Sequence, residues 1–240
     1  MLEHLEFQGF SKESIKFFND LKRNNSTKWF EAHRKEYEAF VMNPAKAFVL
    51  AMGEKLRTFS PDIIAIPKVN KSLFRINRDT RFSPDKSPYK TNLGIFFWEG
   101  SPSRMECPGF YFHLEPPILM LGVGIYMFPK YLFDTFRNSV VHPRYGKELG
   151  EIVAQVSKKK GYQFGGKHYK RVPSGYDPSH PNAELLLYNG LHVGYETSLP
   201  EELYSKKLVT YCFKKFQPIY PLHRWLVALM KRYRSRPLSL

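Results

Sequence analysis

The chain has 240 residues, of which 42% are hydrophobic and 16% aromatic, and it carries a formal net charge of +15 at pH 7. This amount of apolar material can fill a packed core, so the composition excludes a polypeptide that is disordered overall. Charged side chains interrupt the first 25 residues, and the longest apolar run, at 116–129, is shorter than the about 20 residues that cross a bilayer. We therefore expect a cytoplasmic protein without a membrane segment.

The first part of the chain has the apolar spacing of amphipathic helices. The first helix is expected to follow Ser11, whose hydroxyl can cap it. A full capping box is not expected, because Ser14 stands where such a box has Glu or Gln. A second helix is expected from a cap at Thr27, and a third from Pro44 to about Arg57.

The middle of the chain changes to the twofold period of strands, which are expected at 72–77, 93–98, 109–115 and 119–127. Short links between the later strands favour antiparallel neighbours. Alternation places Phe74 on an apolar face. The opposite, polar face is expected to gather Arg75, Asn77, His113 and Glu115.

Two glycines, Gly122 and Gly124, flatten the polar face of the fourth expected strand. Glycine within a strand lets another group approach the backbone closely. A packed helix is the expected occupant of this flat surface, and a ligand is the alternative.

The last part of the chain returns to helical spacing. Helices are expected at 130–139 and 146–159, followed by an irregular stretch and a terminal helix from Pro221. The cluster KRYRSR, which begins at Lys231, suits the negative end of that helix and could also bind nucleic acid or another acidic surface. These elements predict an α+β fold, an antiparallel sheet of about four or more strands flanked by N-terminal and C-terminal helices. A single domain is expected over residues 1–240, helical at 11–58, with the sheet at 70–127 and a mixed and helical part at 128–235.

Motifs of cofactor and metal sites are weak in this sequence. Gly161–Lys167 matches G-x-x-x-x-G-K in spacing, but no strand is expected before it, and His168 stands where a P-loop has Ser or Thr. We interpret the match as coincidence. The histidines show no ligand spacing and Cys107 and Cys212 lie far apart, so no metal site is predicted and any cofactor stays unknown.

His113 and Glu115 are the candidate catalytic pair. Residues two apart on a strand point to the same side, and a carboxylate beside an imidazole orients the ring for general acid–base chemistry. The alternative is an ordinary hydrogen-bonded pair on a partly covered sheet face. No nucleophile accompanies the pair, so the sequence names no reaction.

The strongest candidate for a binding site is the basic stretch LFRINRDTRFSPDKSPYKTN at residues 73–92. Residues 71–92 contain six Lys and Arg against two Asp, and residues 203–240 contain nine against no acid. Arginine forks bind carboxylate or phosphate, and two Ser-Pro turns are expected to shape a loop around the cations. The candidate ligand-binding residues are Arg75, Asn77, Arg78, Arg81, Lys86, Tyr89 and Lys90.

Three hypotheses remain open for this stretch. The first is a site for an anionic ligand, most simply a phosphate-bearing small molecule. The second is a nucleic-acid-associated module that uses both basic segments without catalysis. The third is a structural or interaction scaffold, in which the charges only brace the fold.

The motif LFRINRDTRFSPDKSPYKT, together with NNSTKWFEAHRKEYE, PGFYFHLEP and KRVPSGYDPSHP, resembles a widespread bacterial and fungal family of conserved hypothetical proteins, a domain of unknown function. The resemblance covers roughly residues 7–230, and the sequence departs from the family pattern at PPILML, where a glycine-richer turn is usual. The resemblance implies a single intracellular domain. It implies no activity, cofactor or catalytic residue.

Overall fold

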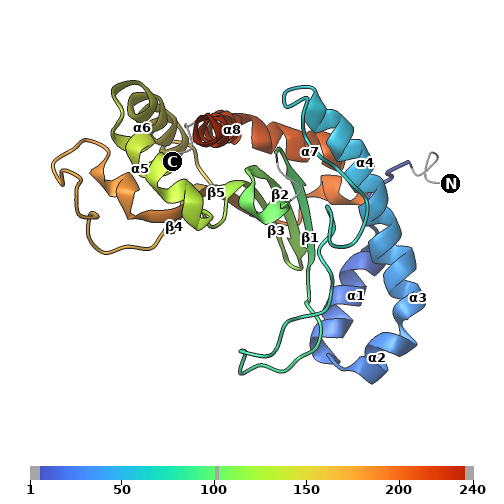
Figure 1. Ribbon diagram of the computed structural model, residues 1–240. Helices are drawn as coiled ribbons and strands as arrows, with labels where there is room; N and C mark the ends of the chain where they lie inside the picture. Colours follow the sequence, from blue (N-terminus) through green and yellow to red (C-terminus); the bar gives the residue numbers. More distant parts are fainter. Residues whose placement is uncertain (1–5, 101–102, 236–240) are drawn as a thin grey trace. The chain divides into compact units, whose positions relative to one another are not determined.

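The structure is a computed structural model, which describes residues 6–100 and 103–235 (Figure 1). It separates into two compact units. The first unit contains residues 6–97, 111–121 and 196–215, and the second contains residues 98–100, 103–110, 122–195 and 216–235. The single domain over residues 1–240 stays a prediction.

The α+β fold is confirmed, with a five-stranded antiparallel sheet and helices in both terminal regions. The strand order is β1-β2-β3-β5-β4. The strands are β1 (Leu93–Trp98), β2 (Gly109–Glu115), β3 (Ile118–Ile125), β4 (Tyr162–Lys167) and β5 (Tyr188–Ser198). The expected bounds of β1 and β2 are confirmed residue for residue, and β3 differs from its expected bounds by one or two residues at each end.

Helices make up most of the rest of the described chain. In the first part they are α1 (Lys12–Arg23), α2 (Thr27–Ala32), α3 (Arg34–Glu36), a π-helix at Tyr37–Met42 and α4 (Asn43–Arg57). Later come α5 (Phe133–Val141), α6 (Pro143–Ser157), α7 (Lys207–Phe216) and α8 (Tyr220–Arg234). Short 3₁₀ turns lie at Arg104–Glu106, Lys130–Leu132, Ala183–Leu187, Glu201–Tyr204 and Gln217–Ile219. Within the described ranges, no helix combines the length and apolarity that a membrane crossing requires.

The caps of α1 and α2 correct two expectations. Ser11 caps α1 as expected, but a capping box is present, because the Ser14 hydroxyl accepts a hydrogen bond from the Ser11 backbone N–H at 3.0 Å. A serine therefore performs the role that Glu or Gln has in the usual box. The cap of α2 is Ser26, which accepts from the Trp29 N–H, and Thr27 is the first helical residue.

The core of the first unit is a cluster of phenylalanine rings on the apolar side of β2. Phe112 lies 4.7 Å from Phe48 of α4 and 6.0 Å from Phe10, measured between ring centroids, and each of the three is at most 1% exposed. Full burial of one such side chain stabilises the folded state by about 1.5–3 kcal/mol. Because one side of β2 is fixed against this core, its alternate residues must point to the other side, and that side carries the site.

Residues 72–77 do not form the expected strand. Leu73 alone pairs with Ile95 of β1, and backbone bonds join Phe74 N–H to Gly94 O and Phe96 N–H to Ser72 O. Directly paired residues share a face, and both Leu73 and Ile95 are fully buried, so Leu73 belongs to the core side. The expected assignment of Phe74 to the apolar face is therefore wrong. Its ring meets the ring of Tyr111 on the polar side of β2, with centroids 5.9 Å apart.

In the second unit, the flat surface at Gly124 is occupied by a neighbouring strand. A Cβ at Gly124, whose φ is +142°, would lie 2.3 Å from the Leu191 carbonyl oxygen of β5. The expected packed helix is thus wrong at this position, because the backbone of β5 takes the space. β5 and its antiparallel partner β4 were not expected, and the Gly161–Lys167 match falls largely on β4, which does not have the loop conformation of a P-loop.

Candidate functional site

A hydrogen-bonded network lies on the polar side of β2. His113 Nε2 is 3.2 Å from Glu115 Oε2, and His113 Nδ1 is 3.0 Å from the Tyr111 hydroxyl. Thr91 donates to the other carboxylate oxygen of Glu115 at 2.9 Å. The side chains of His113 and Glu115 are 20% and 43% exposed, so solvent or a ligand can reach the pair. The expectation that the two residues share one side of a strand is confirmed.

Both ring nitrogens of His113 have polar partners, since the Asn92 side-chain nitrogen also lies 3.3 Å from His113 Nδ1. Burial, with the charge of Glu115 as a smaller cause, raises the pKa of Tyr111 to about 12, so the phenol keeps its proton at neutral pH. The Tyr111 O–H can therefore donate to His113 Nδ1, and in the tautomer that accepts this bond the His113 Nε2–H donates to Glu115. This arrangement fixes the ring orientation of His113 and leaves Glu115 as the charged end of the network.

Gly94 and Phe74 form the wall beside Tyr111. A Cβ at position 94 would stand 2.9 Å from the Tyr111 hydroxyl and 3.2 Å from the Phe74 ring, so only glycine leaves room for both. Tyr111 and Thr91 are network members that the sequence interpretation did not select. Strand parity already placed Tyr111 beside His113, whereas nothing local in the sequence connects Thr91 with Glu115.

The basic stretch forms a loop over residues 78–88, teal in Figure 1, which is closed at its base by the backbone. Asn77 and Tyr89 form an antiparallel bridge, flanked by bonds from Arg78 N–H to Pro88 O and from Lys90 N–H to Ile76 O, of 2.9 and 2.8 Å. In a bridge of this kind the hydrogen bonds belong to the flanking residues. The N–H and C=O of Tyr89 therefore point away from Asn77.

Asn25 binds the outward backbone groups of Tyr89. Its side-chain amide donates to Tyr89 O at 2.9 Å and accepts from Tyr89 N–H at 3.1 Å. The Tyr89 ring is 5% exposed and stacks on Phe30 of α2, with centroids 4.2 Å apart. Tyr89 therefore anchors the base of the loop to the start of α2.

Arg78 is the internal brace of the loop. Its guanidinium pairs with Asp85 and donates to the Ser87 carbonyl and the Ser83 hydroxyl, both at 3.3 Å. Hydrogen bonds from the side chain and backbone N–H of Ser87, together with Arg78, lower the pKa of Asp85 to about 2. Asp85 thus remains charged under all ordinary conditions, and the loop holds its shape through its own residues.

Three other cations of the stretch, Arg81, Lys86 and Lys90, are also held by its own residues. Arg81 makes a bidentate pair with Asp79, at 2.9 and 2.7 Å. Lys86 Nζ donates to Thr80 O at 2.9 Å, and Lys90 Nζ donates to Arg75 O at 3.0 Å. Asp79 and Asp85, the two acids of the stretch, therefore pair with Arg81 and Arg78. The stretch keeps an excess of positive charge after these two pairs are formed.

The predicted site residues fall into two groups. Lys90 lies 5.7 Å over the Phe74 ring, which in turn meets Tyr111, so Lys90 is the cation that these contacts connect with the His113 network. Arg75 and Asn77 are exposed, and in the described part of the chain neither forms a hydrogen bond with His113. The expected strand face that would gather them with His113 and Glu115 does not form, because residues 72–77 make only isolated bridges. The outer part of the loop contains Arg81 and Lys86. The framework that holds the loop in shape contains Arg78, its internal brace, and Tyr89, its anchor.

The basic C-terminal cluster is only partly available to a partner. Arg232 of α8 stacks over Tyr145 of α6 at 4.2 Å and over Trp225 at 5.2 Å, from its guanidinium carbon to each ring centroid. Lys231 and Arg234 are exposed, and Arg236 lies outside the described residues. Arg232 is therefore a packing residue of the second unit and not part of a solvated tail.

Within the described ranges, no three side chains of the His, Cys, Asp or Glu type are grouped so as to hold a metal ion. Cys107 and Cys212 are buried thiols. Burial raises the pKa of the Cys212 thiol, which keeps it protonated. Neither cysteine has the setting of a metal ligand or a reactive thiolate.

Comparison with known proteins adds one positive finding. A family model described as "Conserved hypothetical protein (DUF2461)" matches residues 13–225. No curated protein matches the chain.

Proposed function

The chain belongs to this family of conserved hypothetical proteins, and we propose that it binds an anionic, phosphate-bearing ligand beside the Tyr111–His113–Glu115 network. The observation that carries the proposal is the position of Lys90. It lies over Phe74, next to Tyr111, and donates to the Arg75 backbone carbonyl, so one cation of a strongly basic stretch adjoins the network and the exposed Arg75 follows Phe74 in the chain.

The ligand-binding residues divide according to what each can offer. Arg75, Lys90 and Asn77 would contact the anion near the network, and Arg81 and Lys86 would extend the positive field along the loop. Arg78 and Tyr89 would act indirectly by holding the loop in shape. Both ring nitrogens of His113 have partners in Tyr111 and Glu115, so His113 would exchange a proton with the ligand only by giving up one of these bonds, and no particular reaction is proposed.

Thermal melting with and without inorganic phosphate tests this proposal. A ligand at 100 times its Kd adds about 2.7 kcal/mol to stability, and a chain of this size gains about 2–4 °C in Tm per kcal/mol. Inorganic phosphate should therefore raise the Tm of the wild type and not that of Arg75→Ala, while the control Lys12→Ala should respond like the wild type. An equal response of Arg75→Ala would refute the assignment.

A second candidate function, a nucleic-acid-associated module, is favoured by Phe82. This side chain is 93% exposed on the braced loop, and Arg81 lies 5.7 Å from its ring centroid. Base stacking on an exposed aromatic ring is worth about 1–3 kcal/mol per base. Phe82→Ala should weaken binding to single-stranded DNA or RNA about tenfold. No binding to either at low salt would exclude this candidate.

The salt dependence of such binding would show whether the C-terminal cluster takes part. On duplex DNA, each phosphate that a protein neutralises contributes about 0.9 to the steepness of log affinity against log salt. Lys231→Ala with Arg234→Ala is the appropriate variant, because a deletion from Lys231 onward would also remove the packed Arg232.

The remaining alternative is a scaffold, for which no anion changes the Tm. The two cysteine thiols are consistent with the cytoplasmic location that we propose.

A further inference from the structure

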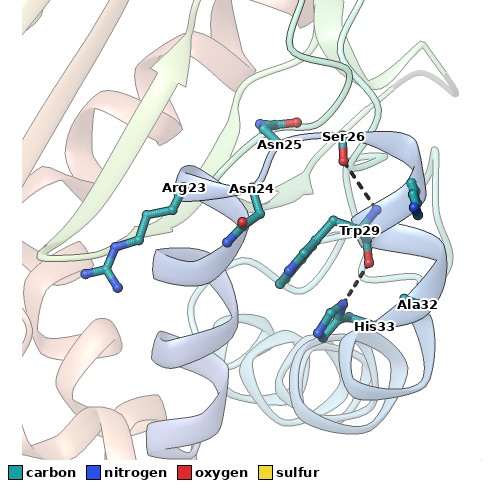
Figure 2. Close-up of a pocket in the computed structure, with 8 residues that line it drawn as sticks. Arg23, Asn24, Asn25, Ser26, Trp29, Ala32 and His33 are labelled. Carbon is teal, nitrogen blue, oxygen red and sulfur yellow. Dashed lines mark hydrogen bonds between the residues drawn. The ribbon is translucent and has the colours of Figure 1, made fainter.

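A shallow groove of about 510 Å³ lies where α1 ends and α2 begins (Figure 2). Its volume is within the range of small-ligand sites. It shares no side chain with the proposed phosphate site. Its lining consists of Arg23, Asn24, Asn25, Ser26, Lys28, Trp29, Ala32 and His33, and so contains cations, amides and aromatic rings but no acid.

The aromatic part of the groove is a stacked pair of rings. Trp29 and His33 lie 4.0 Å apart with an interplanar angle of 14°, and Figure 2 shows both rings on the groove side of α2. The His33 Nδ1–H donates to the Trp29 carbonyl at 2.8 Å, which locks the imidazole parallel to the indole. A flat ring that enters the groove therefore meets a preformed stack, and His33 Nε2 is left for a polar contact.

The charged and polar parts are also open to a ligand. Arg23 is 78% exposed, and its nearest acid, Asp20, is 4.0 Å away and forms a closer pair with Lys16 at 2.6 Å. Lys28 is exposed and has no ion-pair partner in the described part of the chain. Asn24 uses its amide N–H on the Asp20 carbonyl, so its side-chain oxygen can accept from a ligand amine.

We propose that this groove binds a nucleotide unit, with the base stacked on the Trp29–His33 pair and the phosphate on Arg23 and Lys28. Stacking on aromatic side chains beside a positive groove is the general way in which proteins hold single nucleotides of a strand. The side-chain oxygen of Asn24 favours a base with an exocyclic amine. The unit can come from a free nucleotide or from single-stranded nucleic acid.

Tryptophan fluorescence reports on this groove selectively. Trp98 and Trp225 are 2% and 4% exposed, whereas Trp29 is partly exposed. AMP should therefore produce a saturable quenching of the emission excited at 295 nm, and UMP a weaker one. Adenosine and ribose 5-phosphate, which each lack one half of the unit, should bind about tenfold more weakly than AMP or not at all.

Variants separate the groove from the phosphate site. Arg23→Ser with Lys28→Ser should weaken AMP binding about tenfold, whereas Lys12→Ser, at the other end of α1, should leave it unchanged. Trp29→Phe, followed by calorimetry, should also lose affinity, with circular dichroism showing that the variant is folded. Arg75→Ala should bind AMP in the groove like the wild type, so the groove and the phosphate site can fail separately.

The source of the nucleotide follows from a comparison of AMP with a short oligoadenylate. Tighter binding of the oligomer assigns the groove to single-stranded nucleic acid, and equal binding assigns it to a free nucleotide. The proposal is overturned if no probe quenches saturably, if ribose 5-phosphate binds as well as AMP, or if the double serine variant binds AMP like the wild type.

Discussion

Replacement of Asn25 by alanine should detach the base of the basic loop from α2. The substitution removes two hydrogen bonds, of 2.9 and 3.1 Å, and leaves both backbone groups of Tyr89 without a partner. Tyr89 is 5% exposed, so water replaces these bonds poorly. An unsatisfied buried polar group costs about 1–3 kcal/mol, and the two together should lower the stability of the first unit by about 2–6 kcal/mol.

The assay is urea denaturation together with thermal melting. For a chain of this length the loss corresponds to a decrease in Tm of about 4–24 °C. Tryptic cleavage after Arg81 and Lys86 should also accelerate, because the loop loses the attachment that restrains it. Asn25→Asp should be destabilising too, since it keeps an acceptor for the Tyr89 N–H but directs a carboxylate oxygen at the Tyr89 carbonyl.

Asn24→Ala is the matched control. Asn24 is the neighbouring asparagine and is exposed, and its amide makes one hydrogen bond, to the Asp20 carbonyl. Its loss should cost less than about 1 kcal/mol. If Asn25→Ala melts within a degree of Asn24→Ala, the two bonds do not hold the loop, and the anchoring role of Asn25 is wrong.

Three further predictions concern other positions. Gly94→Ala should displace Tyr111 or Phe74 and shift the NMR ring signals of His113, because the new Cβ would lie 2.9 Å from the Tyr111 hydroxyl; unchanged signals would contradict the tight packing. The Ser87 amide signal should titrate with a midpoint near pH 2, because Ser87 binds the Asp85 carboxylate and the pKa of Asp85 is lowered to about 2. The charged carboxylate stabilises the loop fully above about pH 4, and this contribution is lost as the pH falls through about 2. Asp85→Asn should show no such titration. Gly124→Ala should destabilise by about 2 kcal/mol or more in urea, because its φ of +142° and the β5 carbonyl exclude a methyl group; a neutral effect would contradict the close approach.

Sequence patterns predicted the elements whose signal is local. β1 and β2 combine strong apolar content with glycine or proline nearby, and their expected bounds agree with the structure. Residues 72–77 have the same alternation, but only Leu73 pairs with β1. Periodicity reports which residues can face a core, and it does not report how many of them find a partner strand.

β4 was missed for a related reason. It is intermediate or exposed at every position, so its residues show no alternation between buried and open sides. Its place depends on pairing with β5, as in the register of Tyr162 opposite Tyr195. Such long-range pairing leaves no trace in the local period.

The candidate site was also only partly predictable. The spacing of His113 and Glu115 on a strand was sufficient to place them together. The ion pairs of the loop depended on its folded shape, in which Arg78 reaches Asp85 and Arg81 turns back to Asp79. The anchor of the loop, Asn25, lies 64 residues before Tyr89, and no spacing rule connects the two.

The closure of the loop has a consequence for how the protein could diversify. The side-chain partners of Arg78, Arg81 and Lys86 all come from the loop itself, between the paired residues Asn77 and Tyr89. A segment with internal bracing can be transferred as a unit, since another hairpin of the same width at its base would need to supply only the contact that Asn25 makes with Tyr89 here. A peptide of residues 77–89, cyclised across its ends, should therefore retain the Arg78–Asp85 pair. Substitutions at the exposed Phe82 could change what the loop binds, while the ion pairs and hydrogen bonds that brace the loop stay the same.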